Sequence, residues 1–468
     1  MSVLAARFAG AAAVIPSEED LRAQYDILVA SGGSEALWPD AATGRTLSGS
    51  LYQPAPHEIW LSSTDTTAPS PHGHAQALRA LASLMGGQGA AAGGLTLSRW
   101  FEGLRARLTE QFGTPDSTAF LAPSIAAGRD LARAIAFAVH GFSLSEISTG
   151  LSESSDFPVP DQLLDIPLRG DDGLPRLTLD IEDDAADALS LMGRPVLLHL
   201  LDRSRGGLRG VSRDWARDYE QRGDLFTVVD ATAMRASDDL LRADVQEGRC
   251  VLVSGSTFLS GPEGCAALIV PDHVLSQVKH IPPAHLVQHL RAYDVPYLWR
   301  EPLLGGLAGC VNIGLGLRWT AALAEAQRYY AIAPALRHAV LETFTQKVRA
   351  RLTRCEHLLP DAYGDMLDPL RDAIIPLVIP DELGATAQNT AARLRMRLAL
   401  PLEDAGDAIC HLGAPLDFAG QAALPLSASA TMVSDVAGRI ERGISFERAL
   451  APLLRDIDTL FLKIERLA

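Results

Sequence analysis

Four short runs of apolar residues in the middle of the chain limit its possible folds more than any other feature. They cover residues 195–201, 225–231, 250–254 and 266–270. Each run has the length of a strand and little regular alternation of polar residues, as strands buried on both faces of a sheet do. Helical patterns separate several of the runs. This alternation predicts an α/β domain with a mostly parallel sheet.

Polar side chains gather where these predicted strands end. Ser204 follows the first run, Asp230 closes the second and Ser254 closes the third. Ser124 follows an earlier short strand at 119–123 and opens a helical pattern. Because ligands of parallel α/β sheets bind beyond the carboxyl ends of the strands, we expect these four residues to form a site at one edge of the sheet.

The composition of the 468 residues sets the broad class of the protein. Hydrophobic residues make up 47% and charged residues 21%, as in ordinary globular chains. The length of the chain suggests two or three domains. The formal net charge of −16 argues against a nucleic-acid partner, since a phosphate backbone would be repelled. No run approaches the ~20 apolar residues that a membrane span needs. The five cysteines are scattered, so we expect no metal centre, and the cytoplasm is the expected compartment.

Two motifs follow the second and third predicted strands. Residues 230–235, Asp-Ala-Thr-Ala-Met-Arg, are similar to a family motif Asp-Ala-Cys-Gln-x-Arg. Residues 254–258, Ser-Gly-Ser-Thr-Phe, are similar to a family motif Thr-Gly-Ser-Lys-Phe. The order of the motifs resembles that of pyridoxal-phosphate (PLP)-dependent aminotransferases of fold type I, on the class V side. Over residues 60–435 the resemblance covers most of the chain.

The resemblance implies a division into three regions. Residues 1–60 would form an N-terminal arm, and residues 61–320 a PLP-transferase-like large α/β domain with a mostly parallel, seven-stranded sheet. Residues 321–468 would form a linking helix and a smaller C-terminal α+β domain. The linking helix is expected from a helical pattern that runs from about residue 315 to about Leu358.

The resemblance also assigns roles to individual residues. Asp230 would pair with the pyridinium nitrogen of PLP, and a lysine beside the small-residue turn would form the Schiff base. Here that position is Thr257. The further cofactor-binding candidates are serines at strand ends and turns, namely Ser124, Ser204, Ser254 and Ser256. Pro425 stands where the family carries an arginine for the substrate carboxylate, and Ala233 where it carries a glutamine.

A threonine at position 257 changes the expected chemistry. Its hydroxyl forms no imine and is not basic near neutral pH, so ordinary transamination should be lost. We therefore expect a lysine-less homologue that acts as a non-catalytic or regulatory partner of an active paralogue, in a homodimer or a heterodimer. Any PLP would be bound noncovalently.

Other interpretations of the same residues stay open. The pocket could serve a divergent enzyme that holds PLP or its amine form noncovalently, or a different small molecule. It could also be filled by side chains, which would leave a binding or scaffold protein. In that case Asp230 would be a structural carboxylate paired with Arg235 or Arg205. The only lysine near the motif in sequence, Lys279, is expected at the surface.

Overall fold

The computed structural model describes most of the chain. The described ranges are 17–65, 67–86, 93–141, 144–154, 163–193, 195–304, 310–359, 373–380, 384–402 and 407–467. No helix within these ranges combines the length and the apolar character needed to cross a membrane.

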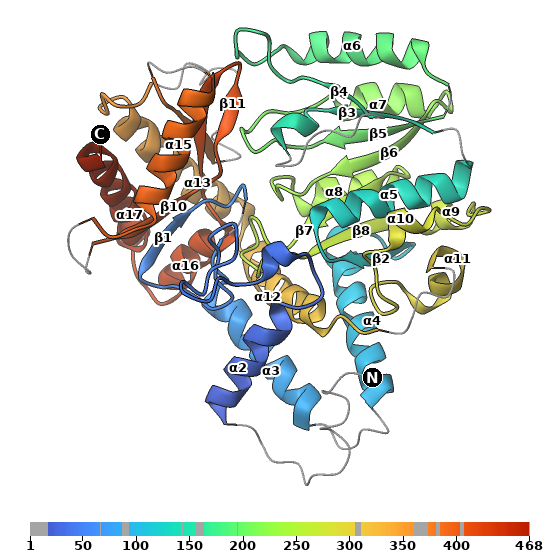
Figure 1. Ribbon diagram of the computed structural model, residues 1–468, viewed down its shortest axis with the longest axis horizontal. Coiled ribbons are helices and arrows are strands. Elements are labelled where there is room, and N and C mark those ends of the chain that lie inside the picture. Colours follow the sequence, from blue (N-terminus) through green and yellow to red (C-terminus); the bar gives the residue numbers. More distant parts are fainter. Residues whose placement is uncertain are drawn as a thin grey trace.

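A seven-stranded sheet forms the centre of the larger part of the molecule, at the right of Figure 1. Its strand order is β2-β8-β7-β6-β5-β3-β4, and the two pairs made by β8 are antiparallel while the others are parallel. The strands are β2 (Ser117–Ala122), β3 (Ser145–Thr149), β4 (Leu163–Ile166), β5 (Val196–Leu201), β6 (Leu225–Asp230), β7 (Cys250–Ser254) and β8 (Ala266–Pro271). The four predicted central strands are therefore confirmed.

Both faces of this sheet are covered. In β8, Ala267 and Ile269 pack into one hydrophobic cluster, whereas Ala266, Leu268 and Val270 pack into another on the opposite face. This double burial explains why the apolar runs lack polar residues at alternate positions. The helices of the first cluster are α4 (Gly93–Phe112), α6 (Thr178–Leu191), α7 (Arg213–Glu220), α8 (Asp238–Gln246) and α12 (Ile313–Tyr330). Those of the second are α5 (Ile125–His140), α9 (Asp272–Leu275), α10 (Ala284–Val287) and α11 (Arg300–Leu304).

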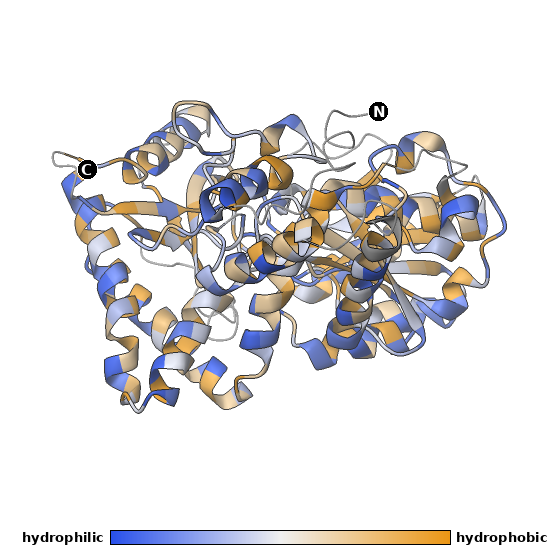
Figure 2. Cartoon of the chain, turned by 90° about the horizontal axis from the view of Figure 1, so that it is seen from below, coloured by the Kyte–Doolittle hydropathy of each residue, from blue (hydrophilic) through white to orange (hydrophobic). Residues whose placement is uncertain are grey.

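The C-terminal part, residues 373–467, lies beside the large sheet at the left of Figure 1. It contains a three-stranded antiparallel sheet in the order β11-β12-β9 and a parallel pair formed by β1 and β10. Its strands are β9 (Ile374–Val378), β10 (Ile409–Leu412), β11 (Leu416–Phe418) and β12 (Gln421–Ser427). Its helices are α15 (Gly384–Leu398), α16 (Ala430–Glu441) and α17 (Phe446–Leu467). Figure 2 shows polar and apolar residues side by side along most helices, as expected where one helix face packs inward.

The N-terminal segment connects the two parts. Helices α2 (Glu18–Val29) and α3 (Pro71–Gly86) pack against α12, and strand β1 (Glu58–Leu61) pairs with β10. The predicted boundaries at 60/61 and 320/321 thus fall inside β1 and inside α12. The described residues also contain three short 3-10 helices, η1 (Glu35–Leu37), η2 (Leu151–Glu153) and η3 (Tyr297–Trp299).

The predicted continuous helical pattern from 315 to 358 is wrong. Helix α12 ends at Tyr330, and a separate helix α13 (Pro334–Leu352) begins three residues later. Pro334 occupies the first turn of α13, where a backbone N–H has no partner within the helix and its absence costs nothing. Inside a longer helix the same proline could not donate a backbone hydrogen bond, so one continuous helix is not possible here. The fold class itself, a PLP-transferase-like α/β part with a smaller C-terminal α+β part, is confirmed.

Candidate functional site

The predicted site residues lie at the carboxyl ends of β5, β6 and β7 and at the start of α5. The structure brings Thr257 close to Asp230, because Thr257 bonds Thr232, two residues beyond Asp230. Ser254 and Ser256 contact each other. Ser124 and Ser204 lie at the same edge of the sheet but bond to other partners. The edge predicted from the sequence is therefore correct, whereas no ligand role follows from position alone.

Asp230 is buried and accepts four hydrogen bonds from described residues of the chain. Arg129 donates Nε and Nη2 to Oδ2 at 3.0 and 2.8 Å, and Thr232 donates its amide and its hydroxyl to Oδ1 at 3.1 and 2.6 Å. Burial alone would raise the pKa of Asp230, but Arg129 and Thr232 outweigh burial and hold this pKa below its usual range. These four bonds use the four lone-pair sites of a carboxylate.

Arg129 is the functional neighbour that sequence reasoning missed. Arg235 and Arg205 were the cations expected for a structural Asp230, whereas Arg129 on α5 forms the ion pair with it. Gly128 makes the approach possible, since a Cβ there would lie 2.5 Å from Leu252 of β7. A signal was present in the sequence: Arg129 shares a helix face with the buried Ala132 and Ala136, and an inward-facing arginine needs an acceptor.

Thr257 and the two serines of its turn bond to the protein around them. The buried Thr257 hydroxyl donates to the carbonyl oxygen of Thr232 at 2.8 Å. The Ser254 and Ser256 hydroxyls are 3.2 Å apart, and the Ser254 hydroxyl donates to the carbonyl of Cys265 at 3.4 Å. This turn is thus tied to β6 and to the start of β8 through its polar side chains.

Ser124 and Ser204 have local structural roles. Ser124 is the N-cap of α5, and its hydroxyl accepts the amide of Ala127 at 3.0 Å. Ser204 is fully buried, donates to Glu153 at 2.9 Å and accepts the amide of Leu208 at 3.0 Å. Glu153 is also paired with Arg169 at 3.1 Å, so Ser204 belongs to a buried polar chain at the end of β5.

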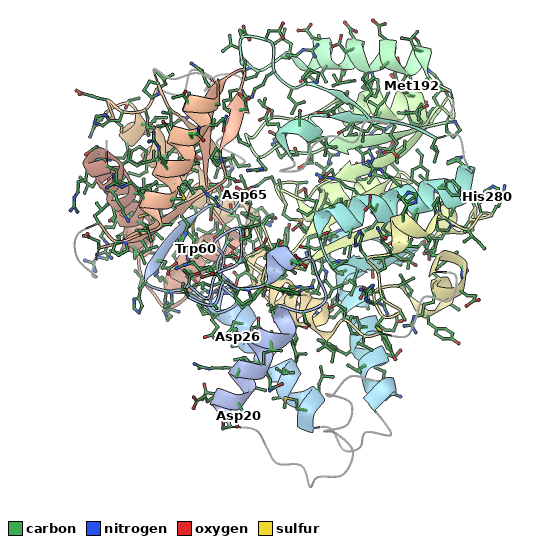
Figure 3. All side chains as sticks on the ribbon, viewed as in Figure 1. Asp20, Asp26, Trp60, Asp65, Met192 and His280 are labelled. Carbon is green, nitrogen blue, oxygen red and sulfur yellow. The ribbon has the colours of Figure 1, made fainter. Side chains whose placement is uncertain are left out.

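Two further arginines connect this edge of the sheet to the C-terminal part. Arg205 pairs with Asp65 at 2.8 Å and donates to the carbonyl of Ala414 at 3.2 Å, and Asp65 accepts the amide of Ala414 at 2.6 Å. Figure 3 places Asp65 between the sheet and the C-terminal part. Arg235 donates to Ser63 at 2.7 Å and to the carbonyl of Ala428 at 3.0 Å. Arg205 and Arg235 are hereafter called the arginine clamp.

All three lysines of the chain lie away from Thr257. Lys347 pairs with Asp458 at 2.7 Å, and the buried Lys463 donates to three backbone carbonyls of the C-terminal part. The exposed Lys279 donates its amide to Ala138, near the far end of α5 from Ser124, which is roughly 20 Å away along the helix. Figure 3 labels the next residue, His280, at that end of α5.

Two cavities among the described residues lie elsewhere and are not lined by Asp230, Ser254 or Thr257. One, of about 340 Å³, lies between the start of α6 and the loop after β5. The other, of about 350 Å³, lies between α4, α8 and α12. Pro425, at the expected place of the substrate-binding arginine, is a buried residue of β12.

Comparison with known proteins identifies the fold. No protein-family model and no curated protein sequence matches the chain. Among solved structures, a NifS-like protein from Rickettsia africae matches with a TM-score of 0.57 and 13% identity over 88% of this chain and 99% of its own. The cysteine desulfurase CsdA from Escherichia coli has a TM-score of 0.56 and 14% identity over 88% and 94%. Ureidoglycine-glyoxylate aminotransferase from Bacillus subtilis has a TM-score of 0.51 and 12% identity over 87% and 99%. The chain therefore has the PLP-transferase-like fold.

The residues at this edge do not fit a covalently held PLP. No lysine lies near Thr257, and the threonine hydroxyl is already a donor to Thr232. A pyridinium N–H would also need an acceptor on Asp230, whose lone pairs are used by Arg129 and Thr232.

Proposed function

We propose that this protein is a non-catalytic member of the PLP-transferase fold that acts as a partner of an active paralogue. The observation that carries the proposal is the buried pair of Arg129 and Asp230, at 2.8 Å. A guanidinium there supplies the positive charge that the pyridinium would supply in an enzyme of this fold. The protein thus satisfies internally the carboxylate that the resemblance assigns to a cofactor.

Thr257 and the arginine clamp support the same proposal. Thr257 provides neither an amine for an imine nor a base for a proton transfer. The clamp fastens residues 63–65 and the C-terminal part over the end of the sheet. In the resembling family the active sites lie at a dimer interface, and we propose that this chain pairs with such an enzyme through the corresponding face.

Titratable groups near Thr257 do not favour a divergent enzyme. The pKa of Asp230 lies below its usual range, and burial raises the pKa of the neighbouring Cys265 thiol to about 12. Near neutral pH the carboxylate is therefore ionised and the thiol is protonated. General acid–base catalysis needs a group whose pKa lies closer to the working pH.

A PLP titration followed by borohydride reduction and peptide mapping tests the cofactor half of the proposal. We expect any trapped adduct in the wild type to map to the exposed Lys279. Thr257→Lys combined with Arg129→Met should restore an adduct at position 257, whereas Thr257→Lys alone should not. A reversible spectral change in the wild type that disappears in Asp230→Asn would instead establish a noncovalent PLP site.

Co-expression with each lysine-bearing protein of this fold from the same genome tests the partner half. Native mass spectrometry should detect a heterodimer with one of them. Homodimers alone, together with transaminase activity of the isolated chain, would contradict the proposal.

A further inference from the structure

Arg318, on α12, is a charged side chain enclosed within the protein, with 0% of its surface exposed. Its Nη1 donates to the carbonyl oxygens of Val29 and Ser31 at 2.6 and 3.1 Å, at the C-terminal end of α2. Helix α2 packs against α12 (Figure 1), and a Cβ at Gly314, one turn before Arg318, would lie 2.1 Å from the carbonyl oxygen of Leu28. This close approach of the two helices shuts the guanidinium away from water.

One edge of the Arg318 guanidinium has no hydrogen-bond acceptor in the described part of the chain. Its Nε and Nη2 are buried there without a partner, although these two groups can donate side by side to one acceptor. No described carboxylate forms an ion pair with Arg318 either. The carbonyl end of α2 supplies only about half an elementary charge. Because a buried charge without a counterion is costly, we expect Arg318 to be neutralised by a group other than these.

The hydroxyl of Tyr25 lies in the same enclosed region. Tyr25 lies one turn before Val29 on the buried face of α2. It belongs to the hydrophobic cluster that contains Leu317 and Ala321, on either side of Arg318 along α12. The Tyr25 hydroxyl is buried and has no hydrogen-bond partner among the described residues. Burial raises the pKa of Tyr25 and the charge of Arg318 lowers it, so the two groups lie within electrostatic range.

Asp294 is a buried carboxyl that interacts with Arg318 but does not neutralise it. The charge of Arg318 lowers the pKa of Asp294, yet burial outweighs this effect and raises that pKa to about 7. Near neutral pH about half of the Asp294 side chains are therefore protonated and carry no charge. A water molecule could accept hydrogen bonds from Arg318 and Tyr25, but it would leave the guanidinium charge uncompensated. An anion supplies both an acceptor and the charge.

We propose that Arg318 and Tyr25 hold a small monovalent anion of the size of chloride between α2 and α12. The anion accepts hydrogen bonds from Nε and Nη2 of Arg318 and from the Tyr25 hydroxyl, while Nη1 keeps its bonds to α2. Complete burial of both side chains favours a single ion over an organic ligand. The site does not depend on the proposed loss of PLP chemistry, because neither side chain bonds to Asp230 or Thr257. Such an ion fastens the N-terminal helix to the rest of the molecule.

Urea unfolding of the full chain at several chloride concentrations tests the site, with methanesulfonate replacing chloride at constant ionic strength. An anion that binds only the folded protein multiplies the folding equilibrium constant by 1 + [Cl⁻]/Kd. Raising chloride from about 20 to about 500 mM should therefore increase this constant severalfold, and by up to about 25-fold for a tight site. A folding constant that does not change over this range would overturn the proposal.

Two buried tyrosines of the same cluster give matched variants. Tyr25→Phe removes one proposed donor and should raise the Kd for chloride about tenfold. Tyr52→Phe removes a hydroxyl that already donates to the carbonyl oxygen of Leu37, so it should lower stability but keep the chloride dependence of the wild type. Equal chloride dependence in the two variants would overturn the proposed site.

Crystals of the wild type soaked in bromide test the position directly. We expect an anomalous difference peak in contact with Nε and Nη2 of Arg318 and with the Tyr25 hydroxyl. Density of a water molecule there, without anomalous signal, would overturn the proposal.

Discussion

The substitution Arg129→Met should destabilise the protein by about 3–5 kcal/mol, because it leaves the Asp230 carboxylate buried without its cation. The side chains of Arg129 and Asp230 are 10% and 4% exposed, so water cannot replace the lost bonds at 3.0 and 2.8 Å. Methionine retains much of the arginine volume, which keeps the cavity contribution small.

The pH dependence of this effect has a definite sign. In the wild type the pKa of Asp230 is lowered, so the stability that the ionised group contributes is present above its unfolded pKa and is lost as pH falls through the folded pKa. Without Arg129, burial raises the pKa of Asp230, and the buried carboxylate then costs stability as pH rises. The deficit of Arg129→Met should therefore be largest near pH 7 and shrink below about pH 4.

Urea denaturation of a double-mutant cycle measures the pair. Adding Asp230→Asn to Arg129→Met should recover at least about 2 kcal/mol, since the uncompensated charge is gone. Arg133→Met, one turn along α5, is the matched control, because Arg133 pairs with the half-buried Asp130 and Glu146 and should cost about 1 kcal/mol or less. The interpretation fails if Arg129→Met costs no more than Arg133→Met and Asp230→Asn restores nothing.

Three further predictions concern other buried groups. Burial raises the pKa of Asp294 to about 7, so the stability contributed by its protonated form is fully present below about pH 4 and is lost as pH rises towards 7. The variant Asp294→Asn should therefore flatten the pH profile of the melting temperature in that window, and its free energy of unfolding should exceed that of the wild type by up to about 4 kcal/mol at pH 8. Lys463→Met should lower the free energy of unfolding in urea by about 2–4 kcal/mol, since three carbonyls lose their donor. Lys347→Met, which removes a partly exposed ion pair, should lower it by under about 1 kcal/mol, and equal losses in the two variants would refute this prediction. Thr257→Val should cost about 1 kcal/mol by the same assay, and no loss would mean that the bond to Thr232 contributes nothing.

Local patterns in the sequence were sufficient for the four central strands of the large sheet, but not for β3 and β4. Short apolar runs without alternation require burial on both faces, and β8 shows that burial residue by residue. The edge of the sheet that carries Asp230 and Ser254 also followed from strand direction alone. The break before α13 was readable as well, because Pro334 forbids a continuous helix.

The partners of the site residues were harder to predict. Asp230 and Arg129 are separated by about a hundred residues, and the sequence offered Arg205 and Arg235 as nearer cations. To identify which arginine pairs with Asp230, one must know how α5 packs on β7, and that packing depends on the close contact at Gly128. Asp65 could not be predicted as a partner of Arg205 either, because its position depends on the long-range pairing of β1 with β10.

The arginine clamp also determines how the molecule can move. Rotation of the C-terminal part against the sheet would pull Arg205 from Asp65 and Ala414, and Arg235 from Ser63 and Ala428, and would break these hydrogen bonds together. Hinge motion needs an interface whose contacts exchange at little cost. The two parts therefore behave as one mechanical body, and heating should unfold them in a single cooperative transition rather than one after the other.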